Sequence, residues 1–147
     1  MTTDAILISR DDAVATVTLN RPEKRNALNL PMWLGLTARF AEIASDDSIR
    51  AVVLTGAGDH FGVGADISEF ETVYKTAADA EDYGAIMFET VCAIRDCPKP
   101  VVAAINGNCI GGGMEIAALC DVRICGESSM FGAPVSKLGV TMPLMFM

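Results

Sequence analysis

The stretch that decides the fold is Val101-Val-Ala-Ala-Ile-Asn-Gly-Asn-Cys-Ile-Gly-Gly-Gly-Met-Glu115. Its first five residues form an uncharged apolar run, which predicts a strand buried on both faces. The glycines at 107–113 predict a turn, and a helix is predicted to follow over 112–119. A buried strand that leads through a glycine turn into a helix is typical of α/β proteins with parallel strands.

The rest of the chain repeats this alternation of strands and helices. Runs rich in β-branched residues predict the strands, and apolar residues at helical spacing predict the helices. The first two strands are separated by an Asp-Asp turn. We therefore expect one domain over residues 1–147, an α/β fold with a mainly parallel sheet. Predicted strands occupy 5–10, 13–20, 50–55 and 121–125, and predicted helices occupy about 31–45 and 80–94.

Composition restricts the partners of this domain. The 147 residues are 51% hydrophobic and carry a formal net charge of −8. A negative field of this kind repels phosphate backbones and anionic lipids, so we expect neither nucleic acid nor a membrane surface as a partner. No uncharged apolar run reaches the roughly 18 residues that span a bilayer. The N-terminus also lacks the basic and apolar regions of a signal peptide.

Cysteine and histidine content argues against a metal site. The spacings Cys92-x4-Cys97 and Cys120-x4-Cys125 differ from the CxxC pairs of zinc sites. We expect no metal ion and five reduced, apolar cysteines, as in a cytoplasmic protein. His60, the one histidine, lies in a turn-like sequence, which predicts an exposed loop residue rather than part of a Ser-His-Asp triad.

Two glycine-rich turns are candidate ligand sites. They are His60-Phe-Gly-Val-Gly-Ala-Asp-Ile-Ser-Glu69 and Asn106-Gly-Asn-Cys-Ile-Gly-Gly-Gly-Met-Glu115. Each follows a buried strand and precedes a helix, the position at which α/β proteins bind ligands. Facing turns of this kind could supply two backbone N–H donors to a developing oxyanion. The alternative is that both are tight turns whose glycines adopt positive φ.

Carboxylates and cations near these turns can have a structural or a functional role. Glu115 is either a first-turn residue placed favourably on a helix dipole or a general base beside the oxyanion donors. Asp66-Ile-Ser-Glu69 predicts a helix cap with its capping-box partner. The loop cations Arg21, Lys24 and Arg25 are either solvated or bind the phosphates of an anionic cofactor.

The order of these motifs resembles the enoyl-CoA hydratase/isomerase, or crotonase, superfamily. The resemblance covers nearly the whole chain, from about residue 6 to its end. Each motif alone has low specificity, whereas their order and spacing together are highly specific. The motifs are Val17-Thr-Leu-Asn-Arg-Pro-Glu-Lys-Arg-Asn-Ala-Leu-Asn29, Arg50-Ala-Val-Val-Leu-Thr-Gly56, Phe61-Gly-Val-Gly-Ala-Asp66, Lys99-Pro-Val-Val-Ala-Ala-Ile-Asn-Gly107, Gly111-Gly-Gly-Met-Glu115, Cys120-Asp121 and Phe131-Gly-Ala-Pro134.

The resemblance implies a crotonase-like spiral of ββα units and an acyl-CoA thioester substrate. Coenzyme A would arrive as part of that substrate, with no separate cofactor. By motif position, the oxyanion donors would be the N–H groups of Ala65 and Gly112, and Glu115 would match the first of two hydratase glutamates. A homo-oligomer, either a trimer or a dimer of trimers, is also implied. The implied CoA-binding residues are Lys24, Ala27, Leu28, Ala65, Asp66, Ile67, Ser68 and Gly112.

Two departures from the family pattern matter. Hydratases carry their second glutamate directly after the Phe-Gly-x-Pro segment, where this chain has Val135. Valine cannot transfer a proton, so a catalytically degenerate acyl-CoA-binding or partner-binding paralogue is the alternative function. The chain also ends on the apolar segment 138–147, before the C-terminal helices of the family. We therefore expect the N-terminal part of a crotonase-like fold, with an apolar edge that favours self-association.

Overall fold

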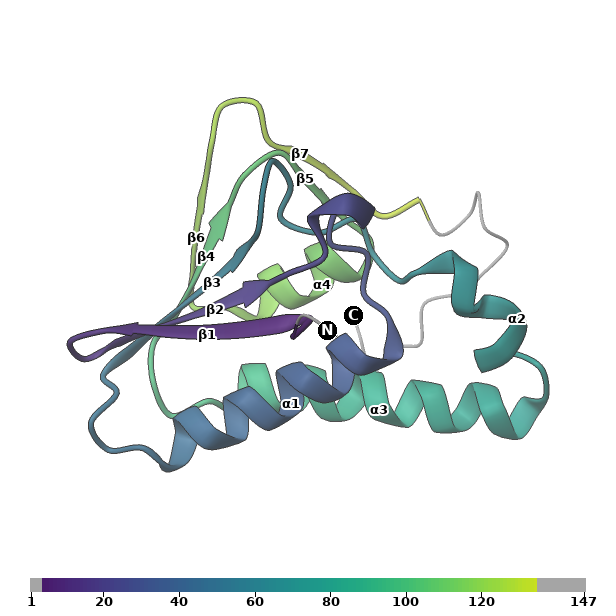
Figure 1. The fold of residues 1–147 in the computed structure, drawn as a ribbon, viewed down its shortest axis with the longest axis horizontal. Coiled ribbons are helices and arrows are strands. Elements are labelled where there is room, and N and C mark those ends of the chain that lie inside the picture. Colours follow the sequence, from purple (N-terminus) through teal and green to yellow (C-terminus); the bar gives the residue numbers. More distant parts are fainter. Residues whose placement is uncertain (1–3, 135–147) are drawn as a thin grey trace.

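Two sheets and four α-helices make up residues 4–134, the part of the chain that the computed structural model describes (Figure 1). The larger sheet holds β1 (Ile6–Asp11), β2 (Val14–Leu19), β3 (Ala51–Gly56), β4 (Val101–Ile105) and β6 (Val122–Cys125), and the smaller one holds β5 (Asn108–Ile110) and β7 (Met130–Gly132). The helices are α1 (Leu30–Ser45), α2 (Phe70–Val73), α3 (Ala77–Arg95) and α4 (Gly112–Leu119), with short 3-10 turns at Pro22–Lys24 and Ile67–Glu69.

The larger sheet has the order β1-β2-β3-β4-β6 and is mainly parallel. Strands β1 and β2 form an antiparallel hairpin, and every later pairing is parallel. Helices link the parallel strands, as parallel pairing requires. This arrangement confirms the predicted α/β class. No sequence pattern predicts the small β5–β7 sheet, because strands of three residues show no alternation.

Helix α1 follows directly from its sequence. The side chain of Asn29 accepts a hydrogen bond from the N–H of Met32, and Pro31 occupies the first turn, where a missing N–H costs nothing. The helix ends at Ser45, and Asp46 is its C-cap. Its buried residues recur at helical spacing and form the apolar stripe that the sequence predicts. They are Met32, Trp33, Leu36, Phe40 and Ile43.

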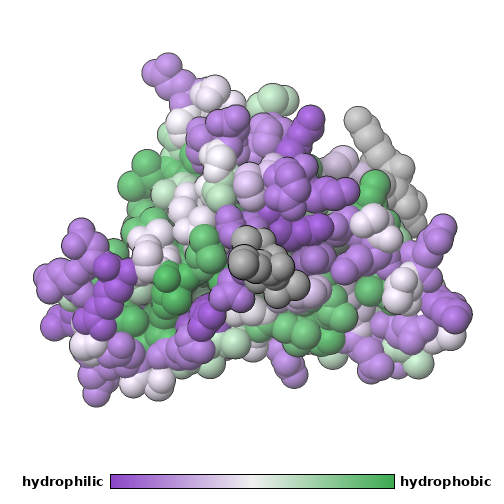
Figure 2. Space-filling model, in the orientation of Figure 1, coloured by the Kyte–Doolittle hydropathy of each residue, from purple (hydrophilic) through white to green (hydrophobic). Residues whose placement is uncertain are grey.

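The core lies against one face of the larger sheet, where residues of β2, β3 and β4 pack with α1, α3 and α4. Along β4, buried residues alternate with the half-buried Val102 and Ala104, so the prediction of burial on both faces is wrong for the described residues. All four residues of β6 are exposed. Figure 2 shows apolar side chains gathered over the strands on this view of the molecule. Exposed apolar residues of β1, β2 and β6 are Leu7, Ile8, Val14, Val122 and Ile124.

Two sequence-based expectations about single residues need correction. His60 is half-buried rather than exposed, because its Nδ1 accepts the N–H of Asn108 at 3.2 Å. All five cysteines are free thiols, but Cys125 is exposed while Cys109 and Cys120 are buried. Burial raises the pKa of Cys109 to about 11. Within residues 4–134, no helix is long and apolar enough to cross a membrane.

A close approach of two backbones fixes the position of α4. A Cβ added at Gly113 would lie 2.8 Å from the carbonyl carbon of Gly62 and still closer to its oxygen. Because backbone atoms cannot move aside as a flexible side chain can, only glycine fits here. The contact holds the start of α4 against the glycine turn that follows β3.

We predict that Gly113→Ala lowers the free energy of unfolding by about 1–3 kcal/mol, the usual cost of overpacking. Gly84→Ala is the matched control, since a Cβ at Gly84 in α3 meets nothing within 4 Å. That substitution should raise the free energy of unfolding by up to about 1 kcal/mol, because alanine is the better helix former. Urea unfolding of both variants checks this, and equal stability of the two would contradict the close packing of α4.

Candidate active site

The two glycine-rich turns face each other. A Cβ added at Gly64 would lie 3.3 Å from the carbonyl oxygen of Ile110, 3.4 Å from the amide nitrogen of Gly112 and 3.6 Å from the Cα of Gly111. Gly64 and Gly111 have φ values of 95° and 52°. The positive φ values agree with the interpretation of these segments as tight turns. The close approach of the two turns agrees with the interpretation that they face each other.

Ala65 and Gly112 present free N–H groups at this junction. Leu28 donates its N–H to the carbonyl of Gly64 at 2.7 Å and accepts the N–H of Asp66 at 2.8 Å, so the pairing skips Ala65. Gly112 begins α4, where the first N–H groups have no partner within the helix. Neither N–H has an acceptor in the chain between residues 4 and 134. Two N–H groups without an acceptor among the described residues therefore lie on the two facing turns.

Apolar and aromatic side chains of the core pack against this junction at Gly112. A Cβ at Gly112 would lie 3.3 Å from Cη2 of Trp33 and 3.4 Å from Cδ1 of Leu28, and both side chains have 0% exposure. Trp33 Nε1 donates to the hydroxyl of Tyr83 at 3.1 Å. The ring of Tyr83 in turn packs edge-on against Tyr74, with centroids 5.7 Å apart. This packing fixes the turn that carries the N–H of Gly112.

Glu115 lies one turn into α4, three residues after Gly112, and is partly buried. Burial raises the pKa of its carboxyl group. Its negative charge is also one cause, after burial, of the raised pKa of Tyr74. Within residues 4–134, no hydrogen bond or ion pair involves the Glu115 side chain, so its oxygens are available to a ligand.

Asp66 is fixed by several partners. Its Oδ2 pairs with Arg21 Nη1 at 2.9 Å, and its Oδ1 accepts from the N–H and hydroxyl of Ser68 at 3.1 and 2.6 Å. Hydrogen bonds from Ser68 lower the pKa of Asp66 despite its burial, with help from Arg21. The prediction that Asp66 caps the following turn is confirmed. Arg21, however, is part of a buried pair and is not a solvated loop cation.

Glu69 does not complete a capping box. Asp66 donates its N–H to Leu28, and the carboxylate of Glu69 instead accepts the N–H of Leu30 at 2.8 Å. Since Leu30 begins α1, Glu69 joins the turn after Ala65 to the start of that helix. A contact between residues 39 positions apart left no local signal in the sequence.

The structure separates the other predicted binding residues into exposed and buried ones. Lys24, Ile67 and Ser68 are exposed, with Ile67 at 62%, whereas Ala27 and Leu28 are at 9% and 0%. Leu28 also has both its backbone groups hydrogen-bonded, so it can support the site but has no free polar atom for a ligand. Val135 lies outside the described residues.

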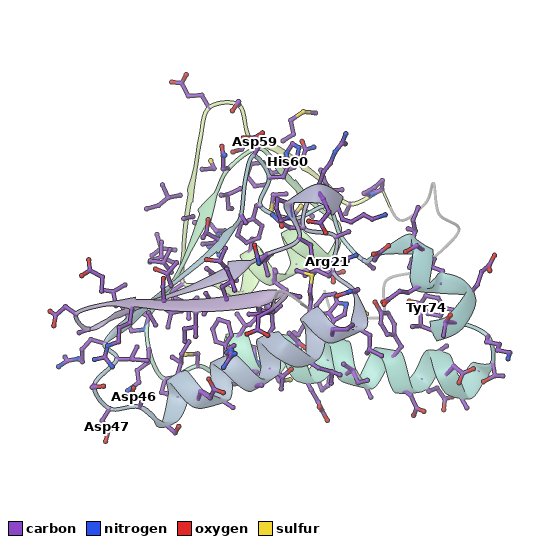
Figure 3. The ribbon with its side chains drawn as sticks, viewed as in Figure 1. Arg21, Asp46, Asp47, Asp59, His60 and Tyr74 are labelled. Atoms are coloured by element: carbon purple, nitrogen blue, oxygen red, sulfur yellow. The ribbon has the colours of Figure 1, made fainter. Side chains whose placement is uncertain are left out.

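Asn26 is a residue of the site that sequence reasoning missed. It is fully buried with φ of 56°, and its side chain accepts the N–H of Arg21 and donates to the carbonyls of Ala57 and His60. The sequence signal for this role is an asparagine in a loop directly before the apolar pair Ala27-Leu28. Asparagine tolerates the positive φ that such a turn requires. Figure 3 shows Arg21 near the centre of the molecule and His60 beside Asp59 at the turn after β3.

A cavity of about 700 Å³ lies beside α1 and does not include the glycine turns. Two arginines line it, but Arg21 is paired with Asp66 and Arg39 with Glu42. Among residues 4–134, no group of three or more metal-ligating side chains comes together. The junction of the two turns has free N–H groups, and the Glu115 carboxylate that follows it on α4 has no partner among residues 4–134.

Comparisons with known proteins agree on one family. A family model described as enoyl-CoA hydratase/isomerase matches residues 9–147. The chain is 40% identical over 140 residues to the Mycobacterium bovis protein named "Probable enoyl-CoA hydratase echA8", covering 95% of this chain and 53% of that one. It is 41% identical over 136 residues to the mouse mitochondrial Delta(3,5)-Delta(2,4)-dienoyl-CoA isomerase, covering 86% of this chain and 42% of the isomerase.

A solved structure extends this similarity to the fold. The crystal structure of an enoyl-CoA hydratase/carnithine racemase from Magnetospirillum magneticum superposes with a TM-score of 0.95 at 47% identity. The alignment covers 99% of this chain and 55% of that one. The chain thus spans about half the length of the relatives it matches. The predicted crotonase-like fold is confirmed over that part.

We predict that Glu115→Gln stabilises the chain at neutral pH. Burial raises the pKa of Glu115 above its ordinary value of 4.5, so the folded chain loses stability as pH rises from 4.5 through the raised pKa. Glutamine has no charge to bury. The variant should have the higher Tm at pH 7 and a nearly equal Tm at about pH 3, where Glu115 is protonated in both the folded and the unfolded states of the unaltered chain. Calorimetry at both pH values checks this, and a lower Tm of the variant at pH 7 would contradict it.

Proposed function

The chain belongs to the enoyl-CoA hydratase/isomerase family, and we propose that it binds an acyl-CoA thioester and stabilises the enolate formed from it. The carbonyl oxygen of the thioester would lie between the N–H groups of Ala65 and Gly112. The observation that supports this most directly is that these two groups lie on facing turns and have no acceptor among residues 4–134.

Two fixed donors favour the enolate over the neutral thioester. Removing a proton next to the carbonyl, or adding a nucleophile across the conjugated double bond, places negative charge on the carbonyl oxygen. A hydrogen bond to that oxygen is stronger in the transition state than in the ground state. Each such donor is worth about 2.7–4 kcal/mol in comparable sites. The positive end of the α4 dipole, at Gly112, acts in the same direction.

Glu115 would act as the acid/base group. Burial raises the pKa of Glu115 toward neutral pH. A general acid or base with a pKa nearer the working pH both accepts and returns a proton more readily. Its oxygens have no partner within residues 4–134, so an incoming substrate would not have to displace one. In double-bond isomerisation, one carboxylate can take a proton from one carbon and deliver it to another, which leaves atoms and charge balanced.

Residues near the turns would bind the rest of the coenzyme. The segment Ala65–Ser68 would line the channel for the pantetheine arm, and Lys24 and Ala27 would contact the nucleotide end. Lys24 is exposed and can approach a phosphate. Arg21 is excluded from this role in the proposal, because its guanidinium is already paired with Asp66. Coenzyme A is part of the substrate, and no separate cofactor is required.

Val135 favours isomerisation over hydration. Syn addition of water to an enoyl thioester needs one group to activate water and one to protonate the α-carbon. The sequence has valine where hydratases have their second glutamate, so the single carboxylate of Glu115 suits proton shuttling better. The relatives include dienoyl-CoA isomerases as well as hydratases.

The same valine favours a second candidate function, an acyl-CoA-binding or partner-binding paralogue without catalysis. In that case the chain would bind acyl-CoA through the two N–H groups but turn over no enoyl, dienoyl or β-ketoacyl thioester. Self-association in the cytoplasm, as a trimer or dimer of trimers, is an expectation that either function would share. Light scattering of the purified chain measures that oligomeric state.

We predict that Glu115→Gln lowers turnover of enoyl- and dienoyl-CoA thioesters by about 10²–10⁴-fold, the usual contribution of a general acid or base. The affinity for a saturated acyl-CoA should change little, because glutamine keeps the size of the side chain. Turnover by absorbance and binding by calorimetry, both on the full chain, check the two halves of the prediction.

Glu81→Gln is the control, since Glu81 is exposed on α3. It should leave turnover unchanged. Equal turnover by the Glu115 variant and the unaltered chain would overturn the role of Glu115. Acyl-CoA binding without any turnover by the unaltered chain would favour the paralogue, and absence of binding would overturn both candidate functions.

A further inference from the structure

The ion pair between Arg21 and Asp66 is less exposed than any other ion pair of the described residues. Its two side chains are 17% and 8% exposed, whereas the other three pairs are each between 31% and 61%. A pair at this depth loses most of its hydration, so its retention calls for a reason other than stability. None of the proposed chemical steps uses it directly.

Arg21 joins the two segments that flank Ala65 and Leu28. Its Nη1 donates to the carbonyl of Ala27 at 2.8 Å and pairs with Asp66 Oδ2 at 2.9 Å. Ala27 precedes Leu28, and Asp66 follows Ala65. The guanidinium therefore connects the segment at residues 27–28 with the segment at residues 64–66. The hydrogen bonds of Leu28 to Gly64 and Asp66 connect the same two segments. Ala65 lies inside this closed set of contacts.

The backbone of Arg21 is itself held by a buried side chain. Asn26 Oδ1 accepts the N–H of Arg21 at 2.9 Å, and Asn26 Nδ2 donates to the carbonyls of Ala57 at 2.9 Å and His60 at 2.6 Å. Asn26 thereby attaches the loop after β2 to the turn after β3. Arg21 is held at both its backbone and its guanidinium, so its ion pair restricts the position of the Asp66 carboxylate.

Both oxygens of Asp66 are committed to this arrangement. Oδ2 faces Arg21, and Oδ1 accepts from the N–H and hydroxyl of Ser68. Because the carboxylate bonds on both sides, rotation of the peptide planes at residues 65 and 66 would break several hydrogen bonds at once. The direction of the Ala65 N–H is thus over-determined by an ion pair and several hydrogen bonds within the chain.

We propose that Arg21 and Asp66 are positioning residues that aim the N–H of Ala65 at the carbonyl oxygen of a bound acyl-CoA. The inference rests on the proposed function, in which that N–H is an oxyanion donor. Pre-oriented dipoles stabilise a developing charge because no reorganisation accompanies the reaction. A misplacement of about 1 Å in such a site can cost about 10²-fold in rate.

Asp66→Asn separates this role from the capping role of Asp66. Asparagine is also a good cap and keeps an oxygen for the N–H of Ser68, but it has no charge for Arg21. Arg21→Lys keeps the positive charge while losing the planar guanidinium that reaches two oxygens. Asp121→Asn is the matched control, because Asp121 accepts the N–H of Val101 at 2.8 Å at the start of β4.

The first measurement is the infrared carbonyl frequency of ¹³C-labelled butyryl-CoA bound to the full chain. Bound to the unaltered chain and to the Asp121→Asn variant, the carbonyl should absorb at lower frequency than in water. In the Asp66→Asn variant most of that lowering should be lost, and in Arg21→Lys part of it. A pair that only stabilised the fold would change Tm and leave the carbonyl frequency unaltered.

The second measurement needs no ligand and uses the ¹⁵N order parameter of the Ala65 amide. It should fall from about 0.85 in the unaltered chain to below about 0.6 in Asp66→Asn. If Asp66→Asn does not fold, Arg21→Lys and Ser68→Ala provide the comparison, since Ser68→Ala removes only the 2.6 Å hydroxyl bond.

The outcomes distinguish the two proposals. An unchanged order parameter and carbonyl frequency in the variants overturn the positioning role while the proposed function stands. An unaltered chain that binds butyryl-CoA without lowering its carbonyl frequency overturns the oxyanion donors, and the positioning role with them. Loss of both signals in Asp66→Asn but not in Asp121→Asn supports the positioning role.

Discussion

The backbone pairing of Leu28 with Gly64 and Asp66 is the interaction on which the candidate site depends. It leaves the intervening N–H of Ala65 unpaired, and it brings the loop after β2 against the turn after β3. The side chain of Leu28 meanwhile packs against Gly112, which carries the other free N–H group. One buried residue thus sets the position of both free N–H groups, although it offers no polar atom of its own.

Glycine makes the remaining geometry feasible. Gly62 and Gly113 allow two backbones to meet without a Cβ between them, and Gly64 and Gly111 supply the positive φ of the two turns. Trp33 then closes the space beneath Gly112. A free carboxylate, Glu115, is kept close by the short helix α4. Burial opposes the negative charge of this carboxylate, so its ionisation lowers the stability of the fold.

Sequence patterns predicted the α/β class, helix α1 and the strands of the larger sheet, because those elements follow local periodicity and capping. They also indicated the two glycine turns, since glycine runs between a strand and a helix are visible along the chain. They could not indicate the pairing of Arg21 with Asp66 or of Glu69 with Leu30, which join residues far apart in sequence. The three-residue strands β5 and β7 are too short to show alternation. The uniformly apolar run of β4 predicts burial on both faces, whereas two of its residues are only half-buried.

The donor role of Ala65 and Gly112 can be measured directly in the amide proton spectrum of the full chain. Saturation with butyryl-CoA should move the amide protons of both residues downfield, as expected when a free N–H gains an acceptor, whereas free coenzyme A, which lacks the thioester carbonyl, should move neither. If butyryl-CoA binds and both amide protons stay where they are in the free chain, the two glycine turns do not form an oxyanion site.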